Sequence, residues 1–237
     1  MRIDKLFSDM GLLSRKECAA AVRRREITVD GAPVKSASVH VDPATQVIRF
    51  CDRTVSYSRF TYVMLNKPAG YVSATDDPRL PYVAQLLPEQ LQRQGLFPTG
   101  RLDRDTVGLM IMTNDGALAH ELLSPRHHVE KVYRFTCESP MCDGCEALFE
   151  KGISIGDYVC KPAKLFADDD RMGGELVLTE GKYHQVKRML EAVDNRVCSL
   201  ERIRFGPLTL DGRLARGEWR YLTAEEIAAL REHRDCL

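Results

Sequence analysis

Apolar residues recur at helical spacing near the start of the chain, which predicts two short helices within residues 1–50. The first helix carries its apolar residues on one face, at Ile3, Leu6, Phe7 and Met10. Ser14 and Glu17 then fit a capping box, in which each side chain bonds the backbone of the other residue. We therefore expect the second helix to begin after Ser14 and to end near Arg25.

The pattern then changes to strands. Apolar residues alternate over residues 27–34 around Asp30-Gly31, a pair that favours a tight hairpin turn, and residues 47–50 fit a closing strand. Residues 51–60 are polar and lack helical periodicity, so they are the expected linker. This pattern predicts a first domain with its linker over residues 1–57 and a second domain over residues 58–237.

Strands and helices mix in the second region without a regular alternation. Short apolar or alternating runs predict strands over residues 62–65, 108–113, 131–137 and 174–179. Helical patterns cover residues 117–123, 146–151, 184–193 and 225–233. Irregular mixing of this kind favours an α+β fold with a mainly antiparallel mixed sheet.

Composition and charge exclude several classes of protein. The 237 residues are 44% hydrophobic and 29% charged, which is ordinary for a globular chain. No apolar run approaches the roughly 18 residues of a membrane helix, and the N-terminus does not resemble a secretory signal, so we expect a cytoplasmic protein. The net charge is zero, yet the first 25 residues hold seven Lys or Arg against three acids. A local basic surface is therefore expected at the N-terminus.

The eight cysteines are scattered, and in a reducing compartment they should be thiols. Cys142 and Cys145 form the one C-x-x-C pattern. A structural zinc site needs more ligands than this pair, so no metal is predicted. A zinc site that also uses Cys137 is kept as an alternative.

A loop over residues 100–109 carries the most distinctive chemistry. Its sequence, Gly-Arg-Leu-Asp-Arg-Asp-Thr-Val-Gly-Leu, places two carboxylates and two guanidinium groups just before a buried strand. An aspartate flanked by arginines stays ionised, as a nucleophile or base requires. Taken alone, Asp103 and Asp105 are better explained as turn and cap residues than as catalytic ones. Glycine-rich nucleotide loops, the hydrolase elbow and the zinc-protease motif are all missing from the sequence.

The same loop, followed by Thr-Asn-Asp-Gly, resembles the active-site motif of pseudouridine synthases. Three further stretches agree with that family in order, at residues 62–71, 124–133 and 180–189. The helices and hairpin of residues 1–50 resemble an S4 RNA-binding domain. An S4-like domain before a synthase domain resembles the RsuA-type branch of ribosomal RNA pseudouridine synthases.

The resemblance implies site-specific isomerisation of uridine to pseudouridine in ribosomal RNA, by base flipping and without a cofactor. Asp103 matches the catalytic nucleophile, and Tyr133 matches the tyrosine that packs on the uracil. Lys187 matches the basic residue that pairs with the aspartate, and Arg101 matches the residue that fills the space left by the flipped base. Other expected RNA contacts are Arg2, Lys5, Arg15, Lys16, Arg23, Arg24, Arg25 and Arg188.

Several alternatives stay open. The carboxylate would attack either C1′ of the ribose or C6 of the ring. The residues of the motifs at 124–133 and 180–189 and the absence of a long basic tail favour small-subunit RNA as the substrate. An enzyme that acts on large-subunit RNA is the alternative. A non-catalytic, ribosome-associated S4 protein is the alternative from another class. The expected partner is ribosomal RNA or a partly assembled subunit, bound by a monomer away from any membrane.

Overall fold

The structure is a computed structural model that describes residues 1–124 and 126–235. The chain divides into two compact units, Met1–Thr61 with Leu87–Leu96, and Tyr62–Leu86 with Phe97–Leu237. The domain boundary between residues 57 and 58 stays a prediction. Pro125, which belongs to the family-like stretch of residues 124–133, and Cys236 lie outside the described residues.

The two predicted helices of the first unit are confirmed as α1 (Ile3–Asp9) and α2 (Arg15–Arg23). The capping box is also present. Ser14 Oγ accepts from the Glu17 N–H at 3.2 Å, and a Glu17 carboxylate oxygen accepts from the Ser14 N–H at 2.7 Å. The second helix ends two residues earlier than predicted, because Arg25 takes a left-handed conformation with φ of 59°.

A four-stranded sheet completes this part of the unit in the order β2-β1-β3-β4. The predicted hairpin is confirmed, with β1 (Ile27–Val29) and β2 (Ala32–Pro33) joined by two residues of positive φ, Asp30 and Gly31. β3 (Ile48–Phe50) pairs with β1, and β4 (Arg53–Thr54) pairs with β3. The prediction that residues 51–60 are only a linker is therefore wrong at Arg53 and Thr54.

A later segment of the chain belongs to the first unit as well. The short helix α3 (Glu89–Arg93), which the sequence analysis did not predict, presents Gln90 and, just after it, Gln94 to the end of α1. Both side-chain amides donate to the Met10 carbonyl, at 3.3 and 2.8 Å. A guanidinium nitrogen of Arg93 also lies 3.3 Å from a carboxylate oxygen of Glu17. The segment therefore contacts the chain on both sides of the loop between α1 and α2.

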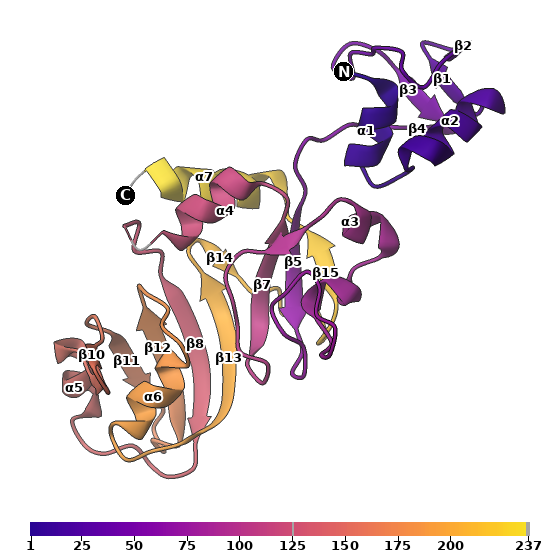
Figure 1. Cartoon of the computed structure of the whole chain (residues 1–237). Coiled ribbons are helices and arrows are strands. Elements are labelled where there is room, and N and C mark those ends of the chain that lie inside the picture. Colours follow the sequence, from indigo (N-terminus) through magenta and orange to yellow (C-terminus); the bar gives the residue numbers. More distant parts are fainter. Residues whose placement is uncertain (125, 236–237) are drawn as a thin grey trace. The chain divides into compact units, whose positions relative to one another are not determined.

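The second unit is built on a nine-stranded mixed sheet (Figure 1). Its main order is β11-β12-β8-β13-β7-β5-β15, and β6 and β14 pair with β7 and β13. Only the β13–β7 pair is parallel among the described strands, so the predicted mainly antiparallel mixed sheet is confirmed. The strands are β5 (Tyr62–Lys67), β6 (Phe97–Pro98), β7 (Val107–Thr113), β8 (Lys131–Cys137), β11 (Lys164–Ala167), β12 (Gly173–Leu178), β13 (Val197–Phe205), β14 (Leu208–Thr209) and β15 (Trp219–Tyr221).

Helices accompany this sheet close to where periodicity predicted them. They are α4 (Gly116–Leu123), α5 (Cys145–Lys151), α6 (Gln185–Glu191) and α7 (Ala224–Asp235), with a 3-10 turn at Val83–Leu86 and a small hairpin of β9 (Ser154–Ile155) and β10 (Tyr158–Val159). Asp115 caps α4 by accepting from the Leu118 N–H, and its other oxygen accepts from the Tyr62 hydroxyl at 2.6 Å. Apolar residues of α5, α6, β8 and β12 share one buried core, which fixes α6 against the sheet.

The central strand β13 was not predicted. It joins the two halves of the sheet, antiparallel to β8 and parallel to β7. On the β7 side, Arg202 of β13 pairs with Gly108, which has φ of 101°. A side-chain carbon at Gly108 would lie 2.4 Å from the Arg202 carbonyl oxygen, so only glycine allows the two strands to approach this closely.

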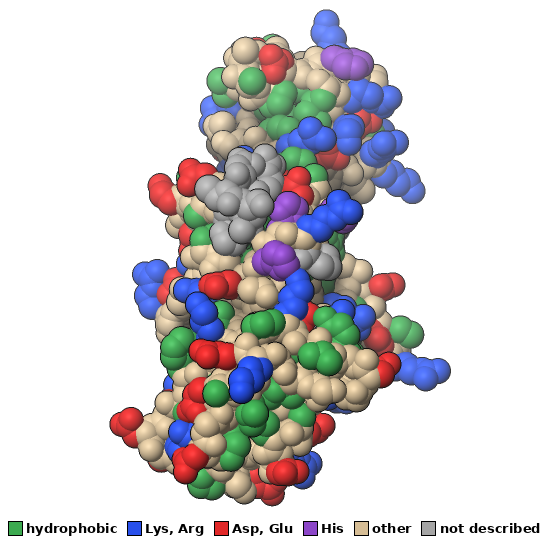
Figure 2. All heavy atoms as spheres, turned by 90° about the vertical axis from the view of Figure 1, so that its left-hand side faces the viewer, with side chains coloured by type: hydrophobic (Ala, Val, Ile, Leu, Met, Phe, Trp, Pro, Cys, Tyr) green, Lys and Arg blue, Asp and Glu red, His purple; other side chains and the backbone are tan. Residues whose placement is uncertain are grey.

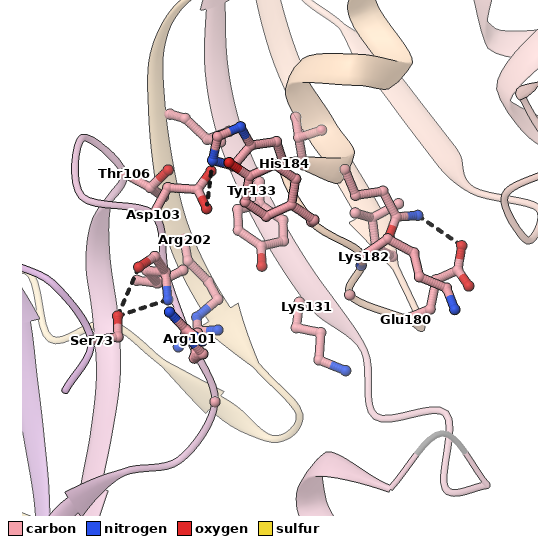
Figure 3. A pocket seen from close by; sticks show the side chains of 18 of the residues that line it. Ser73, Arg101, Asp103, Thr106, Lys131, Tyr133, Glu180, Lys182, His184 and Arg202 are labelled. Atoms are coloured by element: carbon pink, nitrogen blue, oxygen red, sulfur yellow. Dashed lines mark hydrogen bonds and ion pairs between the residues drawn. The ribbon is translucent and has the colours of Figure 1, made fainter. Parts of the chain in front are cut away.

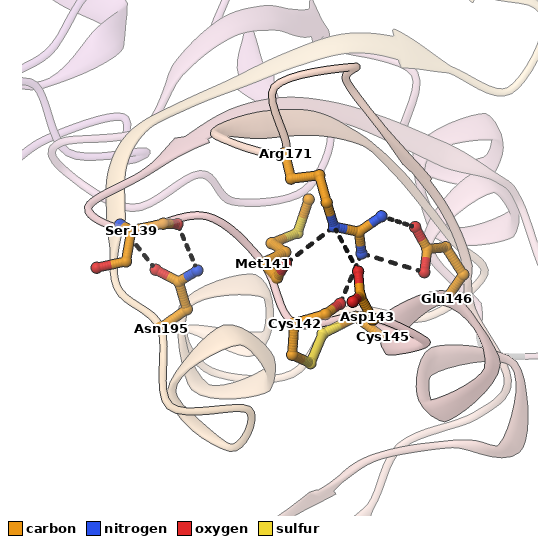
Figure 4. The surroundings of a disulfide bond; sticks show 8 residues. All are labelled: Ser139, Met141, Cys142, Asp143, Cys145, Glu146, Arg171 and Asn195. Carbon is orange, nitrogen blue, oxygen red and sulfur yellow. Dashed lines mark hydrogen bonds and ion pairs between the residues drawn. A yellow bond between two sulfur atoms is a disulfide. The ribbon is translucent and has the colours of Figure 1, made fainter.

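The prediction that all cysteines are thiols is wrong at Cys142 and Cys145, which form a disulfide (Figure 4). The carbonyl of Cys142 accepts from Arg171, whose guanidinium also pairs with Glu146 at 3.1 Å. The zinc alternative loses two of its three sulfur ligands, because each is bonded to the other. In the described part of the chain no group of three His, Cys, Asp or Glu is placed to hold a metal, and no helix there is long and apolar enough to cross a membrane.

Candidate active site

The second unit contains a cavity of about 620 Å³ that opens beside the loop carrying Asp103 (Figure 3). Most of its lining residues come from four parts of the chain, which are residues 100–106, strand β8, residues 180–186 and strand β13. Side chains of both signs line it, together with Leu178, Leu200 and Phe205. A pocket with an apolar floor and converging polar groups is the usual form of a small-molecule or nucleotide site.

The loop that carries Asp103 is fixed through its backbone. The Ser73 hydroxyl donates to the Leu102 carbonyl at 2.7 Å and accepts from the Leu102 N–H at 2.9 Å. On the other side of Asp103, the Arg104 carbonyl accepts from the Gly70 N–H at 2.8 Å. These bonds hold the residues before and after Asp103, so the carboxylate is presented from a defined backbone.

Lys67 lies beneath the same loop and is fully buried. Its ammonium donates to the carbonyls of Asp103, Arg104 and Thr106, at 3.0, 3.3 and 2.7 Å. Burial lowers the pKa of Lys67 to about 8, although the charges of Asp105 and Asp103 oppose that shift. The sequence analysis had included Lys67 only as part of the family-like stretch of residues 62–71 and had assigned it no role.

Asp103 meets two basic residues from the α6 region. Lys187 Nζ lies 3.2 Å from one carboxylate oxygen, and His184 Nε2 lies 3.6 Å from the other. The Asp103 side chain is 28% exposed, so it is neither sealed in the core nor directed into bulk solvent. The structure therefore brings together Asp103 and Lys187, which are 84 positions apart in the sequence.

Lys187 is shared between two carboxylates. Its ammonium donates to Asp105 at 2.6 Å, closer than to Asp103. Burial alone would lower the pKa of Lys187, but its bonds to Asp105 and Asp103 raise it. Burial likewise opposes the shift of Asp105, whose pKa is lowered by Lys187. Lys187 therefore stays positively charged, and its ammonium is shared between Asp105 and Asp103.

Tyr133 lines the same cavity from β8, where it is half-buried beside the core residue Phe135. His184 stands across from it at the start of α6, in a left-handed conformation with φ of 50°. Tyr183 stacks on the His184 ring, with centroids 3.8 Å apart. The three predicted catalytic residues, Asp103, Tyr133 and Lys187, therefore gather at one place, although their roles stay predictions.

The floor of the cavity holds two cations that the sequence analysis missed. Arg202 of β13 is 2% exposed, and its Nε donates to the Leu109 carbonyl at 2.8 Å. Lys131 of β8 donates to the Val129 carbonyl at 2.6 Å. Burial lowers the pKa of Lys131 to about 8, and the charge of Arg202 adds to that shift. Because β13 itself was not predicted, nothing in the local pattern indicated Arg202.

The two predicted RNA contacts of this unit differ in position. Arg101 is exposed and lines the cavity, as a residue that enters a nucleotide's place would have to. Arg188 is not among the residues that line the cavity, and its guanidinium donates to the Ile155 carbonyl. Part of its side chain is therefore engaged within the unit.

The predicted N-terminal contacts are exposed, but they are not equivalent. Arg2 pairs with Asp4, Lys5 with Asp9, and Arg24 with Glu26. Of these seven cations, Arg15, Lys16, Arg23 and Arg25 form no salt bridge with a described residue. Figure 2 shows Lys and Arg side chains gathered along one side of the first unit. Exposed cations without an intramolecular partner are free to contact phosphates.

Comparison with known proteins agrees with this geometry. A protein-family model described as RNA pseudouridylate synthase matches residues 61–192, and one described as S4 domain matches residues 1–47. The chain is 44% identical to a Bacillus subtilis protein named uncharacterized RNA pseudouridine synthase YtzG, covering 98% of this chain and 99% of that one. It is 43% identical to the ribosomal small subunit pseudouridine synthase A of Salmonella typhimurium, over 97% and 100% of the two chains.

A solved structure is similar as well. The crystal structure of a pseudouridylate synthase superposes with a TM-score of 0.69 at 38% sequence identity, covering 97% of this chain and 99% of that one.

Proposed function

The chain belongs to the RNA pseudouridylate synthase family, and from that premise we propose that it converts a specific uridine of small-subunit ribosomal RNA to pseudouridine. Relatives named ribosomal small subunit pseudouridine synthase A, 42–43% identical over nearly the whole chain, support this choice of RNA. The observation that carries the proposal is the Asp103 carboxylate, held by Lys187 and His184 at the mouth of a nucleotide-sized cavity.

The reaction detaches uracil from C1′ of its ribose and rejoins it through C5. Asp103 is the group that attacks, either at C1′ or at C6 of the ring. Neither atom is accessible inside a stacked helix, so the uridine must first leave the stack. Lys187 orients the carboxylate, since its side chain is only 20% exposed and its ammonium lies between two aspartates. No oxidation occurs and no energy source is consumed.

The flipped base enters the cavity and packs on Tyr133. An aromatic surface offsets part of the stacking energy lost on flipping, which amounts to a few kcal/mol. Arg101 stands exposed at the entrance and takes the space that the base has left. Tyr133 therefore contacts the flipped base, and Arg101 fills the position that the base has left in the RNA helix.

The first unit supplies affinity through its basic surface, formed by Arg2, Lys5, Arg15, Lys16, Arg23, Arg24 and Arg25. Contacts between these cations and phosphates position RNA without reading its sequence. Arg188 adds charge near α6. The partner is then ribosomal RNA or a partly assembled small subunit in the cytoplasm, bound by a monomer.

The test is direct. Purified protein is incubated with small-subunit and large-subunit ribosomal RNA, and pseudouridine is mapped by chemical modification and primer extension. We expect one modified uridine, in small-subunit RNA. Modification of large-subunit RNA alone would contradict the substrate, and the absence of pseudouridine in both RNAs and in assembly intermediates would favour the non-catalytic binding protein.

A further inference from the structure

Arg202 is a buried cation without an anionic partner. Its Nη2 atom is sealed from solvent and has no hydrogen-bond partner among the described residues. No carboxylate of the described chain lies within salt-bridge distance of it. An arginine keeps its charge in proteins, and burying an unpaired charge costs several kcal/mol. The structure offsets part of this cost through the Leu109 carbonyl, the Phe205 ring, whose centroid lies 5.1 Å from the guanidinium carbon, and a hydrogen bond to the Tyr133 side chain, but none of these partners is a carboxylate.

The Arg202 side chain borders the cavity, and Nη2 lies just beneath the cavity surface. Arg202 lines the cavity together with Asp103 and Tyr133 (Figure 3). Two acids line the cavity, and both have other partners. Asp103 pairs with Lys187, and Glu180 accepts from the Tyr158 hydroxyl, the Lys161 N–H and the Gln185 amide. Lys131, the second floor cation, adds positive charge to the same place.

The position of the charges decides which part of a nucleotide meets Arg202. The floor around it is apolar and buried, formed by Leu200 and Phe205. The exposed cations Arg101, Arg104 and Lys182 line the cavity as well. Phosphates remain tied to the strand and meet exposed cations, whereas the flat base of a flipped nucleotide fills the apolar floor.

We propose that the Arg202 guanidinium donates a hydrogen bond to a carbonyl oxygen of the flipped uracil and stabilises the negative charge that this ring acquires during the reaction. The inference rests on the proposed function. When the C1′–N1 bond breaks, both electrons stay on the ring, and one negative charge spreads over N1, O2 and O4. C5 then bonds to C1′ while the bond from the Asp103 oxygen to C1′ breaks and its electrons return to the carboxylate; C5 loses its proton, and N1 gains one. If Asp103 adds to C6 first, the electrons of the C5–C6 double bond move through C5 to O4, so O4 carries negative charge by either route.

A preorganised donor of this kind acts on the rate more than on binding, because the charge appears only as the bond breaks. Arg202→Met should therefore lower the single-turnover rate constant by about a hundredfold, the usual effect of losing one such donor. The affinity for RNA should change less than about threefold, because the phosphate contacts are untouched. Arg204→Met is the matched control, since Arg204 lies on the same strand but pairs with Glu130.

A second substrate separates charge stabilisation from a structural role. Fluorine at C5 withdraws electrons and stabilises the same ring anion, so an RNA with 5-fluorouridine at the target needs Arg202 less. Detachment of the base is followed by ¹⁹F NMR under single-turnover conditions. We expect the ratio of wild-type to Arg202→Met rates to be at least about fivefold smaller with 5-fluorouridine than with uridine, about 1 kcal/mol.

An equal ratio for both substrates, or a wild-type rate in Arg202→Met, would overturn the role of Arg202 while the proposed function stands. A wild-type protein that isomerises no uridine in any ribosomal RNA would remove both. Circular dichroism shows whether Arg202→Met folds. If it does not, Arg202→Lys carries the same comparison, because it keeps the charge and loses the guanidinium donor.

Discussion

The ammonium of Lys187 lies between two carboxylates, 3.2 Å from Asp103 and 2.6 Å from Asp105. Lys187 therefore fixes the direction of the Asp103 side chain, and Asp105 fixes Lys187. Lys187→Met should lower the single-turnover rate of pseudouridine formation by about tenfold to a hundredfold, equal to about 1.4–2.8 kcal/mol of transition-state free energy. Lys187→Arg should retain more activity, because it keeps a cation that reaches both aspartates.

The control for this prediction is Lys164→Met, which removes an exposed lysine of β11 far along the sheet order from the Asp103 loop. It should isomerise uridine at the wild-type rate. Equal rates for Lys187→Met and wild type would show that the pair with Asp103 does not contribute to catalysis.

The stability of the protein should depend on pH through Lys67. Burial holds the pKa of Lys67 near 8, below its ordinary value of 10.5. Between these two pH values the unfolded chain binds more protons, so the free energy of unfolding rises as pH increases from about 8 to about 10.5. Urea unfolding across this range should show wild type gaining up to about 3 kcal/mol relative to Lys67→Met.

Lys131 also has a pKa near 8 and contributes a slope of the same sign in both proteins, so the comparison with Lys67→Met isolates one residue. A difference between the two proteins that stays constant over this range would contradict the burial of a charged Lys67.

The close approach of β7 and β13 should make Gly108 sensitive to any side chain. Gly108→Ala places a carbon 2.4 Å from the Arg202 carbonyl and requires an alanine at φ of 101°. We expect a loss of about 3 kcal/mol or more in the free energy of unfolding, measured by urea denaturation. Gly116→Ala is the control, because nothing lies within 4 Å of its added carbon, and it should be neutral.

The basic surface of the first unit should determine how RNA binding responds to salt. Arg23 and Arg25 form no salt bridge among the described residues, whereas Arg24 makes two bonds to Glu26, at 2.7 and 2.8 Å. Changing Arg23 and Arg25 to Ala should reduce the slope of log affinity against log salt by about two. Arg24→Ala should reduce it by less than about one. Unchanged slopes would leave α2 without a role in binding.

Local signals explain what the sequence predicted well. The capping box at Ser14 and the Asp30-Gly31 turn act over three or four residues, so they could be identified without knowing the fold. The predicted strands of the second unit, such as β5 and β7, consist mostly of consecutive apolar residues.

Long-range contacts explain what was missed. Strand β13 mixes Glu201, Arg202 and Arg204 with apolar residues and is interrupted by two register shifts, so it shows no clear alternation. The approach of His184 to Asp103 joins residues 81 positions apart, and no local pattern encodes it. Lys187 was identified only through resemblance to a family, and the sharing of its charge with Asp105 required coordinates.

The most direct test replaces one oxygen. Asp103→Asn keeps the shape of the side chain and removes its charge, and Asp105→Asn makes the same change two residues away in the same loop. Both variants should bind small-subunit RNA within about twofold of wild type, because neither removes a cation. Single-turnover assays should detect no pseudouridine with Asp103→Asn and clear formation with Asp105→Asn. Pseudouridine formed by Asp103→Asn at a wild-type rate would contradict the assignment of Asp103 as the attacking group.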